Sequence, residues 1–334
     1  MMKMKFKTII AAAAILLVSI CSCKKEEPTN DYFSGEITLP FPEYVNAGYT
    51  KTFSIDTLTV LKKTDGSKDG IGYYYTDVDL KRDTLKTEDG AVLKRTFTVT
   101  APSSLETHHF SFSGYAAGYY GSAATAYFTV VSEDSITGME HAVDDPSFTD
   151  PRDGRKYYTA EGCGLEWMAS NLTWKGAGFP YLDCPAMTPI FGNYYTWEEA
   201  QTVCPEGWRL PTDAEWTALA VQYGGEASAE PFMDIKGAAG KLMAIAQFNN
   251  ETLWEYWPQV GIDNASGLTV LPFGYAMTGE GSHKFDGYQK YAAFWTADQE
   301  GGYGVYRLFY DNQNMIFTGR GSKTDFAASV RCVR

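Results

Sequence analysis

Residues 196–216 read TWEEAQTVCPEGWRLPTDAEW and decide how the second half of the chain folds. Thr196 is followed three residues later by Glu199, and Thr212 is followed in the same way by Glu215. This spacing predicts a capping box, in which the Thr and Glu side chains satisfy backbone N–H groups at the start of a helix. A Pro-Glu-Gly turn separates the two boxes. The sequence therefore predicts two short helices back to back.

The chain that follows these helices is rich in loops and then in β-forming residues. Trp216, Leu219 and Ala220 share one face at helical spacing, and a Gly-Gly pair ends the run. Four later stretches have the composition of strands, namely 267–275, 292–297, 305–310 and 328–333.

The first half of the chain has the pattern of an all-β domain. Residues 94–100 alternate between polar and apolar side chains, and pairs such as Asp-Gly mark the turns. We expect an immunoglobulin-like sandwich over residues 32–134, serving as a spacer or packing module, and an acidic linker over 135–150. The expected strands fall within 51–61, 71–78, 92–100, 108–114 and 124–131.

The start of the chain has the pattern of a lipoprotein signal peptide over residues 1–22. Three lysines precede an uncharged apolar run that is too short to span a bilayer comfortably. The run ends in Ile20-Cys21-Ser22-Cys23, which resembles a lipobox, because a small residue precedes Cys23. The resemblance implies that Cys23 carries the lipid, including palmitate.

Residues 23–31 are expected to form a solvated tether, because residues 24–30 are polar or charged apart from one proline. Their Lys-then-Glu order resembles the export signal of surface lipoproteins in Bacteroides-like bacteria. We therefore expect a lipid-anchored protein of the outer membrane that faces the cell exterior.

The net charge narrows the classes of partner. The formal charge of the chain is −13, and without the three signal lysines it is about −16. Such acidity disfavours nucleic acid and anionic lipid headgroups, so we expect membrane contact through the lipid anchor only.

Four cysteines lie beyond the signal region: Cys163, Cys184, Cys204 and Cys332. In an exported protein they predict two disulfides, and the sequence alone leaves three connectivities open. No close C-x-x-C pair is present to suggest a zinc site.

Several segments together resemble the Fibrobacter succinogenes major paralogous domain over about residues 148–334. They are Trp167–Leu172, Tyr195–Ala200, Cys204–Thr212 and Ser329–Arg334, in the order typical of that family. More distantly, residues 197–215 resemble the two helices of C-type lectin-like domains. This likeness implies an α+β C-type lectin-like domain over 151–334 and a Cys204–Cys332 bridge, which leaves Cys163 and Cys184 as the second pair.

The same stretch, Arg209–Trp216, also resembles formylglycine-generating enzymes, which bind copper through two nearby cysteines late in the chain. Only Cys332 lies there, and one thiolate does not supply the second soft ligand that Cu(I) requires. G-x-S-x-G and H-E-x-x-H are both absent from the sequence. We therefore expect no enzyme activity, no catalytic residues and no cofactor.

A binding surface is the remaining prediction, and it rests on aromatic residues beside carboxylates and amides. The calcium-binding loops of C-type lectins are not matched, so bound calcium is possible but unsupported. The candidate ligand contacts are Trp254, Tyr256, Trp257, Tyr288, Trp295 and Tyr303. The alternative is that these rings anchor loops to the core.

The sequence therefore predicts a surface lipoprotein whose non-catalytic lectin-like module binds a glycan or a protein. The alternative is a structural or adhesive subunit of a surface or fimbria-like assembly.

Overall fold

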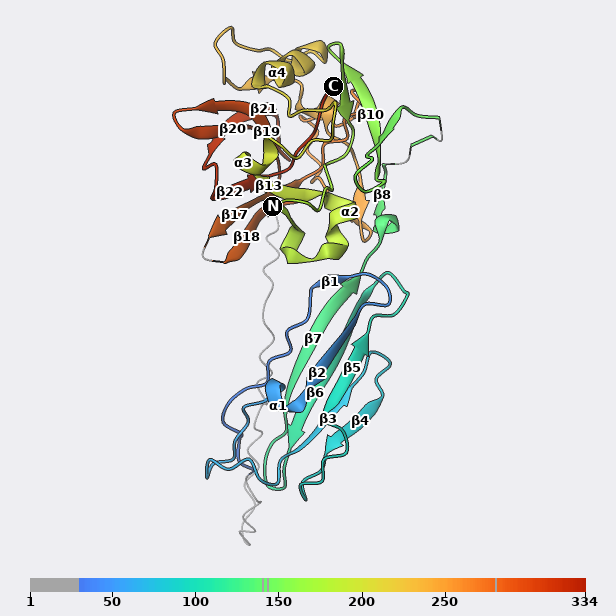
Figure 1. Cartoon of the computed structure of the whole chain (residues 1–334), viewed down its shortest axis with the longest axis vertical. Helices are drawn as coiled ribbons and strands as arrows, with labels where there is room; N and C mark the ends of the chain where they lie inside the picture. Colours follow the sequence, from blue (N-terminus) through green and yellow to red (C-terminus); the bar gives the residue numbers. More distant parts are fainter. Residues whose placement is uncertain (1–29, 140, 143, 280) are drawn as a thin grey trace, which may run out of the picture.

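The structure, a computed structural model, describes residues 30–139, 141–142, 144–279 and 281–334. The predicted signal peptide, the predicted lipid site at Cys23 and tether residues 24–29 lie outside the described residues. The described chain forms two parts that lie end to end, with an elongated β-sandwich below a larger C-terminal part (Figure 1).

The N-terminal part consists of two β-sheets. The larger has five strands in the order β1 (Tyr44–Val45), β7 (Ser122–Val130), β6 (Thr107–Tyr115), β3 (Gly72–Thr76) and β4 (Arg82–Lys86). The smaller pairs β2 (Thr50–Ser54) with β5 (Thr96–Thr100), and a single helical turn, α1 (Ile55–Leu58), follows β2. β1 is parallel to β7, and the other pairs are antiparallel.

Alternating side chains build the core between these sheets. In β5 every second residue is buried, so Phe97 and Val99 point inward. The Phe97 ring stacks on Tyr75 of β3, with ring centroids 4.5 Å apart, and on Phe112 of β6 at 5.7 Å. This arrangement fits the predicted immunoglobulin-like sandwich.

Residues 132–150 connect the two parts and contribute structure of their own. A short 3-10 turn, η1 (Glu133–Ser135), leads into β8 (Ile136–Thr137), which pairs with β15 (Gln247–Phe248) beside β16 (Glu251–Thr252). β9 (Ser147–Thr149) then pairs with β10 (Lys156–Gly162), whose other neighbour is β11 (Leu165–Met168). The segment predicted as a linker is therefore partly incorporated into the C-terminal part.

A nine-stranded sheet dominates the C-terminal part. Its helices are short: α2 (Thr188–Phe191), α3 (Trp197–Ala200), α4 (Asp213–Gln222) and α5 (Ala239–Leu242), with the 3-10 turns η2 (Tyr181–Asp183) and η3 (Pro185–Met187). The strand order is β12 (Phe179–Pro180), β13 (Asn193–Thr196), β22 (Phe326–Ala328), β17 (Phe273–Gly279), β19 (Tyr291–Glu300), β20 (Tyr303–Tyr310), β21 (Gln313–Gly321) and β14 (Ile235–Lys236), and β18 (Ser282–Tyr288) pairs with β17.

The predicted α+β C-type lectin-like fold is wrong. The structure is mostly β, with 41% of residues in strands and 12% in helices, distributed over several sheets. The capped helices exist, but α3 has four residues and α4 has ten, so they do not form a helical layer comparable to the sheet. The prediction located both helix starts correctly, but it wrongly inferred the architecture of the whole domain from them.

Aromatic packing connects α4 to the sheet. The buried Trp216 ring of α4 contacts Trp167 of β11 and Phe294 of β19, with ring centroids 5.0 and 5.4 Å away.

None of the helices in the described residues has the length and apolar character needed to span a membrane.

Candidate functional site

Both predicted capping boxes are present and fix the starts of α3 and α4. Glu199 N–H donates to Thr196 Oγ1 at 3.3 Å, and Thr196 N–H donates to the Glu199 carboxylate at 2.8 Å. Thr212 and Glu215 repeat the arrangement at 3.2 and 2.8 Å. These bonds satisfy backbone groups that would otherwise lack partners at the helix starts.

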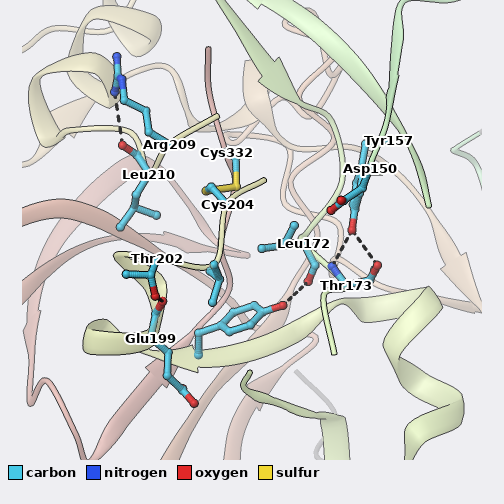
Figure 2. The surroundings of a disulfide bond; sticks show 12 residues. Asp150, Tyr157, Leu172, Thr173, Glu199, Thr202, Cys204, Arg209, Leu210 and Cys332 are labelled. Atoms are coloured by element: carbon cyan, nitrogen blue, oxygen red, sulfur yellow. Dashed lines mark hydrogen bonds between the residues drawn. A yellow bond between two sulfur atoms is a disulfide. The ribbon is translucent and has the colours of Figure 1, made fainter. Parts of the chain in front are cut away.

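The predicted Cys204–Cys332 disulfide is confirmed, and it joins residues 128 positions apart in sequence (Figure 2). Cys332 is fully buried, and its backbone carbonyl accepts a hydrogen bond from Met168 N–H at 3.0 Å. One residue further on, Val333 and Arg209 exchange two backbone hydrogen bonds, of 2.8 and 2.9 Å. The bridge therefore fixes the final segment beside the turn that precedes α4.

The predicted Cys163–Cys184 pair is wrong, because both thiols are free. Cys163 is exposed in the turn between β10 and β11, and its backbone N–H donates to Gln222 at the end of α4. Cys184 is buried in an apolar cluster that joins the sandwich to the C-terminal part, a contact that we call the joint. It lies near Tyr44 of the sandwich, and burial raises the pKa of its thiol. The two residues belong to different regions of the fold, so no bridge forms between them.

A second interaction, which no sequence pattern indicated, also holds the final segment. Arg331 is buried, and no carboxylate of the described residues pairs with it. Its guanidinium donates to Asn171 Oδ1 and to the carbonyls of Met168, Leu268 and Thr269, at 2.6–3.1 Å. Burial lowers its pKa to about 9, which leaves the group charged at neutral pH. Hydrogen bonds to four oxygen atoms thus compensate the buried positive charge, as a counter-ion would.

Two of the predicted ligand contacts are core residues instead. Trp254 is 2% exposed, and its Nε1–H donates to the Val270 carbonyl at 3.0 Å. Trp295 is fully buried, and its Nε1–H donates to the Tyr195 carbonyl at 2.7 Å. Neither ring has a face free to stack on a ligand, so for these two residues the prediction is corrected.

Of the other four predicted contacts, only Tyr256 and Tyr288 line the same hollow. Trp257 is partly buried against the core, and Tyr288 is partly buried in the cluster at the joint. Tyr303 is exposed in β20, outside the hollow described below. Tyr256 is 80% exposed, the highest value among the large hydrophobic residues of the described chain.

Three of the six residues do line one surface hollow of about 510 Å³. We call this feature the Tyr256 hollow. It lies between the end of β16 and the segment after it, the turn from β18 to β19, and the start of the turn after β20. Its lining residues are Thr252, Leu253, Trp254, Glu255, Tyr256, Tyr288, Gln289, Lys290 and Asp311.

The polar side of the Tyr256 hollow is acidic. Asp311 is only 8% exposed, and burial, reinforced by the negative charge of Glu255, raises the pKa of its carboxyl group. Lys290 partly opposes that rise, and the Lys290 carbonyl accepts a hydrogen bond from Asp311 N–H at 3.0 Å. Gln289 Nε2 donates to the Thr252 carbonyl at 3.2 Å, which ties two walls together. The hollow therefore combines an exposed ring with carboxylates and an amide.

The sequence singled out Tyr256, which is exposed, but did not indicate Asp311, Gln289 and Lys290 as its neighbours. Glu255 adjoins the aromatic residues in sequence and could have been included. Asp311 lies 55 residues beyond Tyr256, and no local pattern indicates that the turn after β20 brings it there.

A second hollow, of about 310 Å³, lies beside the start of α4. There Asp213 forms a buried ion pair with Arg307, at 2.8 Å. Burial raises the pKa of Asp213 and lowers that of Arg307, as expected for charges removed from water.

Within the described ranges, no three His, Cys, Asp or Glu side chains are grouped so as to hold a metal ion.

The model of the Fibrobacter succinogenes major domain matches residues 161–334. No curated protein and no solved structure matched the chain.

Proposed function

The chain belongs to the Fibrobacter succinogenes major domain family, and we propose that it is a non-catalytic glycan-binding lipoprotein. A lipid on Cys23 holds it at the outer membrane, facing the cell exterior, and the Tyr256 hollow receives the ligand. The observation that carries the proposal is the largely exposed Tyr256 ring beside a buried carboxylate at the wall of the hollow, Asp311.

Sugar chemistry suits this combination of groups. The C–H face of a pyranose packs on an aromatic ring, and its hydroxyl groups donate to carboxylates such as Asp311 and Glu255. Tyr256 is exposed before any ligand arrives, so covering it removes apolar surface from water without first breaking core contacts. Gln289 and Lys290 add donors on the opposite wall.

The test is a glycan array probed with the oxidised protein from residue 24 onward. The variants are Tyr256→Ala and Asp311→Asn, and Tyr303→Ala, an exposed tyrosine outside the hollow, is the matched control. Loss of one stacking ring, about 1.4 kcal/mol, corresponds to about tenfold weaker binding. We expect that loss in Tyr256→Ala and no change in Tyr303→Ala.

Binding that survives Tyr256→Ala, or an array without any bound glycan, would contradict the proposal. A protein ligand whose binding depends on Tyr256 would keep the site and replace the ligand class.

A structural role in a surface or fimbria-like assembly is the second candidate, and one observation favours it. In the described chain β2 and β5 pair only with each other among the named strands, which leaves an outer edge on each for another strand. Light scattering on the same protein checks this role, because an assembling subunit forms species larger than the monomer as its concentration rises.

A further inference from the structure

The end of the sandwich farthest from the C-terminal part carries a stacked pair of exposed tyrosines. The Tyr32 and Tyr120 ring centroids are 4.9 Å apart, and the two residues are 74% and 48% exposed. Each ring has an apolar face and a polar hydroxyl tip. A contiguous pair of exposed rings is the kind of apolar patch that marks a contact with a partner or a membrane.

The backbone presents these rings in a fixed position. Asp31 N–H donates to the Gly118 carbonyl, and Tyr120 N–H donates to the Asp31 carbonyl, both at 2.9 Å. Behind them Phe33 stacks on Tyr119 at 4.9 Å, and the Tyr119 hydroxyl group lies 2.8 Å from Thr64 Oγ1. The tyrosine pair therefore belongs to the folded sandwich.

The position of this end follows from the strand directions. β6 descends to the turn at residues 116–121, and β7 returns from it toward η1 and the joint (Figure 1). Each strand has nine residues, which is about 30 Å at 3.3 Å per residue. The tyrosine pair and the C-terminal part are thus separated by the length of the sandwich.

The anchor reaches only this end. Cys23 precedes Asn30 by seven residues, so the tether spans at most about 25 Å even when fully extended. That reach is shorter than the sandwich. A lipid on Cys23 therefore keeps the membrane surface near Asn30 and the tyrosine pair that follows it.

We propose that Tyr32 and Tyr120 lie in the headgroup region of the membrane that holds the lipid anchor, and that the sandwich stands on this contact. The inference rests on the proposed lipid attachment at Cys23. Tyrosine suits the boundary between headgroups and acyl chains, because its ring is apolar and its hydroxyl group stays hydrated. The contact uses rings rather than charge, and it adds a protein contact to the lipid anchor, which was the only membrane contact expected from the sequence. It places the Tyr256 hollow on the part of the protein beyond the sandwich.

The test uses the lipidated full chain, purified from membranes and placed in phosphatidylcholine vesicles that contain doxyl-labelled lipid. An environment-sensitive fluorophore is attached through Ala123→Cys, which is exposed near the tyrosine turn, or through Ala47→Cys, which is exposed at the opposite end of the sandwich. Cys163→Ser removes the exposed native thiol from both proteins. We expect the doxyl lipid to quench the probe at 123 and not the probe at 47.

Two further measurements separate the causes of a negative result. Tyr32→Ser combined with Tyr120→Ser should reduce the quenching at 123, because the rings hold that end at the surface. Unquenched probes at both positions, or quenching at 123 that is insensitive to the double substitution, would overturn the contact while leaving the lipoprotein assignment intact. A Cys23 peptide without acyl mass in the native protein would overturn both.

Discussion

The Cys204–Cys332 bridge should contribute more stability to the C-terminal part than any other single bond. Closing a loop between residues 128 positions apart restricts the unfolded chain, and the chain-entropy relation gives about 5 kcal/mol for that length. The paired substitution Cys204→Ala with Cys332→Ala should therefore lower the free energy of unfolding by about 5 kcal/mol, less whatever strain the native bridge carries.

Intrinsic fluorescence isolates the relevant transition, because all eight tryptophans lie in the C-terminal part, between Trp167 and Trp295. Urea unfolding followed by this signal should show a lower midpoint for the double variant. Reduced wild-type protein should resemble it, since reduction removes the bridge while keeping both sulfur atoms in the core. Cys163→Ala is the matched control and should unfold like the wild type. An unfolding free energy of the double variant within about 1 kcal/mol of the wild type would refute the loop-closure reasoning.

Three more changes have defined outcomes. Arg331→Met should lower the unfolding free energy by at least about 3 kcal/mol in urea, because four buried oxygens lose their donor, and Arg331→Lys should not restore it. Burial raises the pKa of Asp150, but hydrogen bonds from Arg152 outweigh burial and hold it below its ordinary value. The stability that this carboxylate contributes is therefore present above its ordinary pKa and lost as the pH falls through the folded value, so the Tm of Asp150→Asn should fall less than the wild-type Tm between about pH 5 and 2. The pKa of Asp311 is raised, so ionisation of that carboxyl group costs stability as the pH rises through its folded pKa, and Asp311→Asn should have a higher Tm at neutral pH; an unchanged or lower Tm would contradict this.

Local sequence patterns predicted those elements whose causes are local. The capping boxes at Thr196 and Thr212 are made by residues three positions apart, so sequence alone located both helix starts. The alternation at 94–100 likewise located β5. β4, with the sequence RDTLK, was missed, because its charged residues lack the composition of a strand and pairing with β3 holds it in place.

The candidate site was predicted only in part, because its walls come from segments that are far apart in the sequence. Tyr256 was correctly expected to be accessible, but the same aromatic pattern included Trp254 and Trp295, whose ring N–H groups bond to buried carbonyls. Whether a tryptophan faces inward is decided by the strands around it. The cysteines illustrate the same limit, since one pair meets across 128 residues and the other two cysteines stay in separate regions.

The burial of residues 330–333 has a consequence for the order of events during biosynthesis. These residues emerge after almost all of the chain that packs against them, including Met168 and Arg209. The sandwich can fold as soon as its own residues are available, whereas the C-terminal part cannot pack fully until residues 330–333 are available. Oxidation of Cys204 with Cys332 is thus a late event, because the two cysteines are 128 positions apart and the second lies in the segment that packs last.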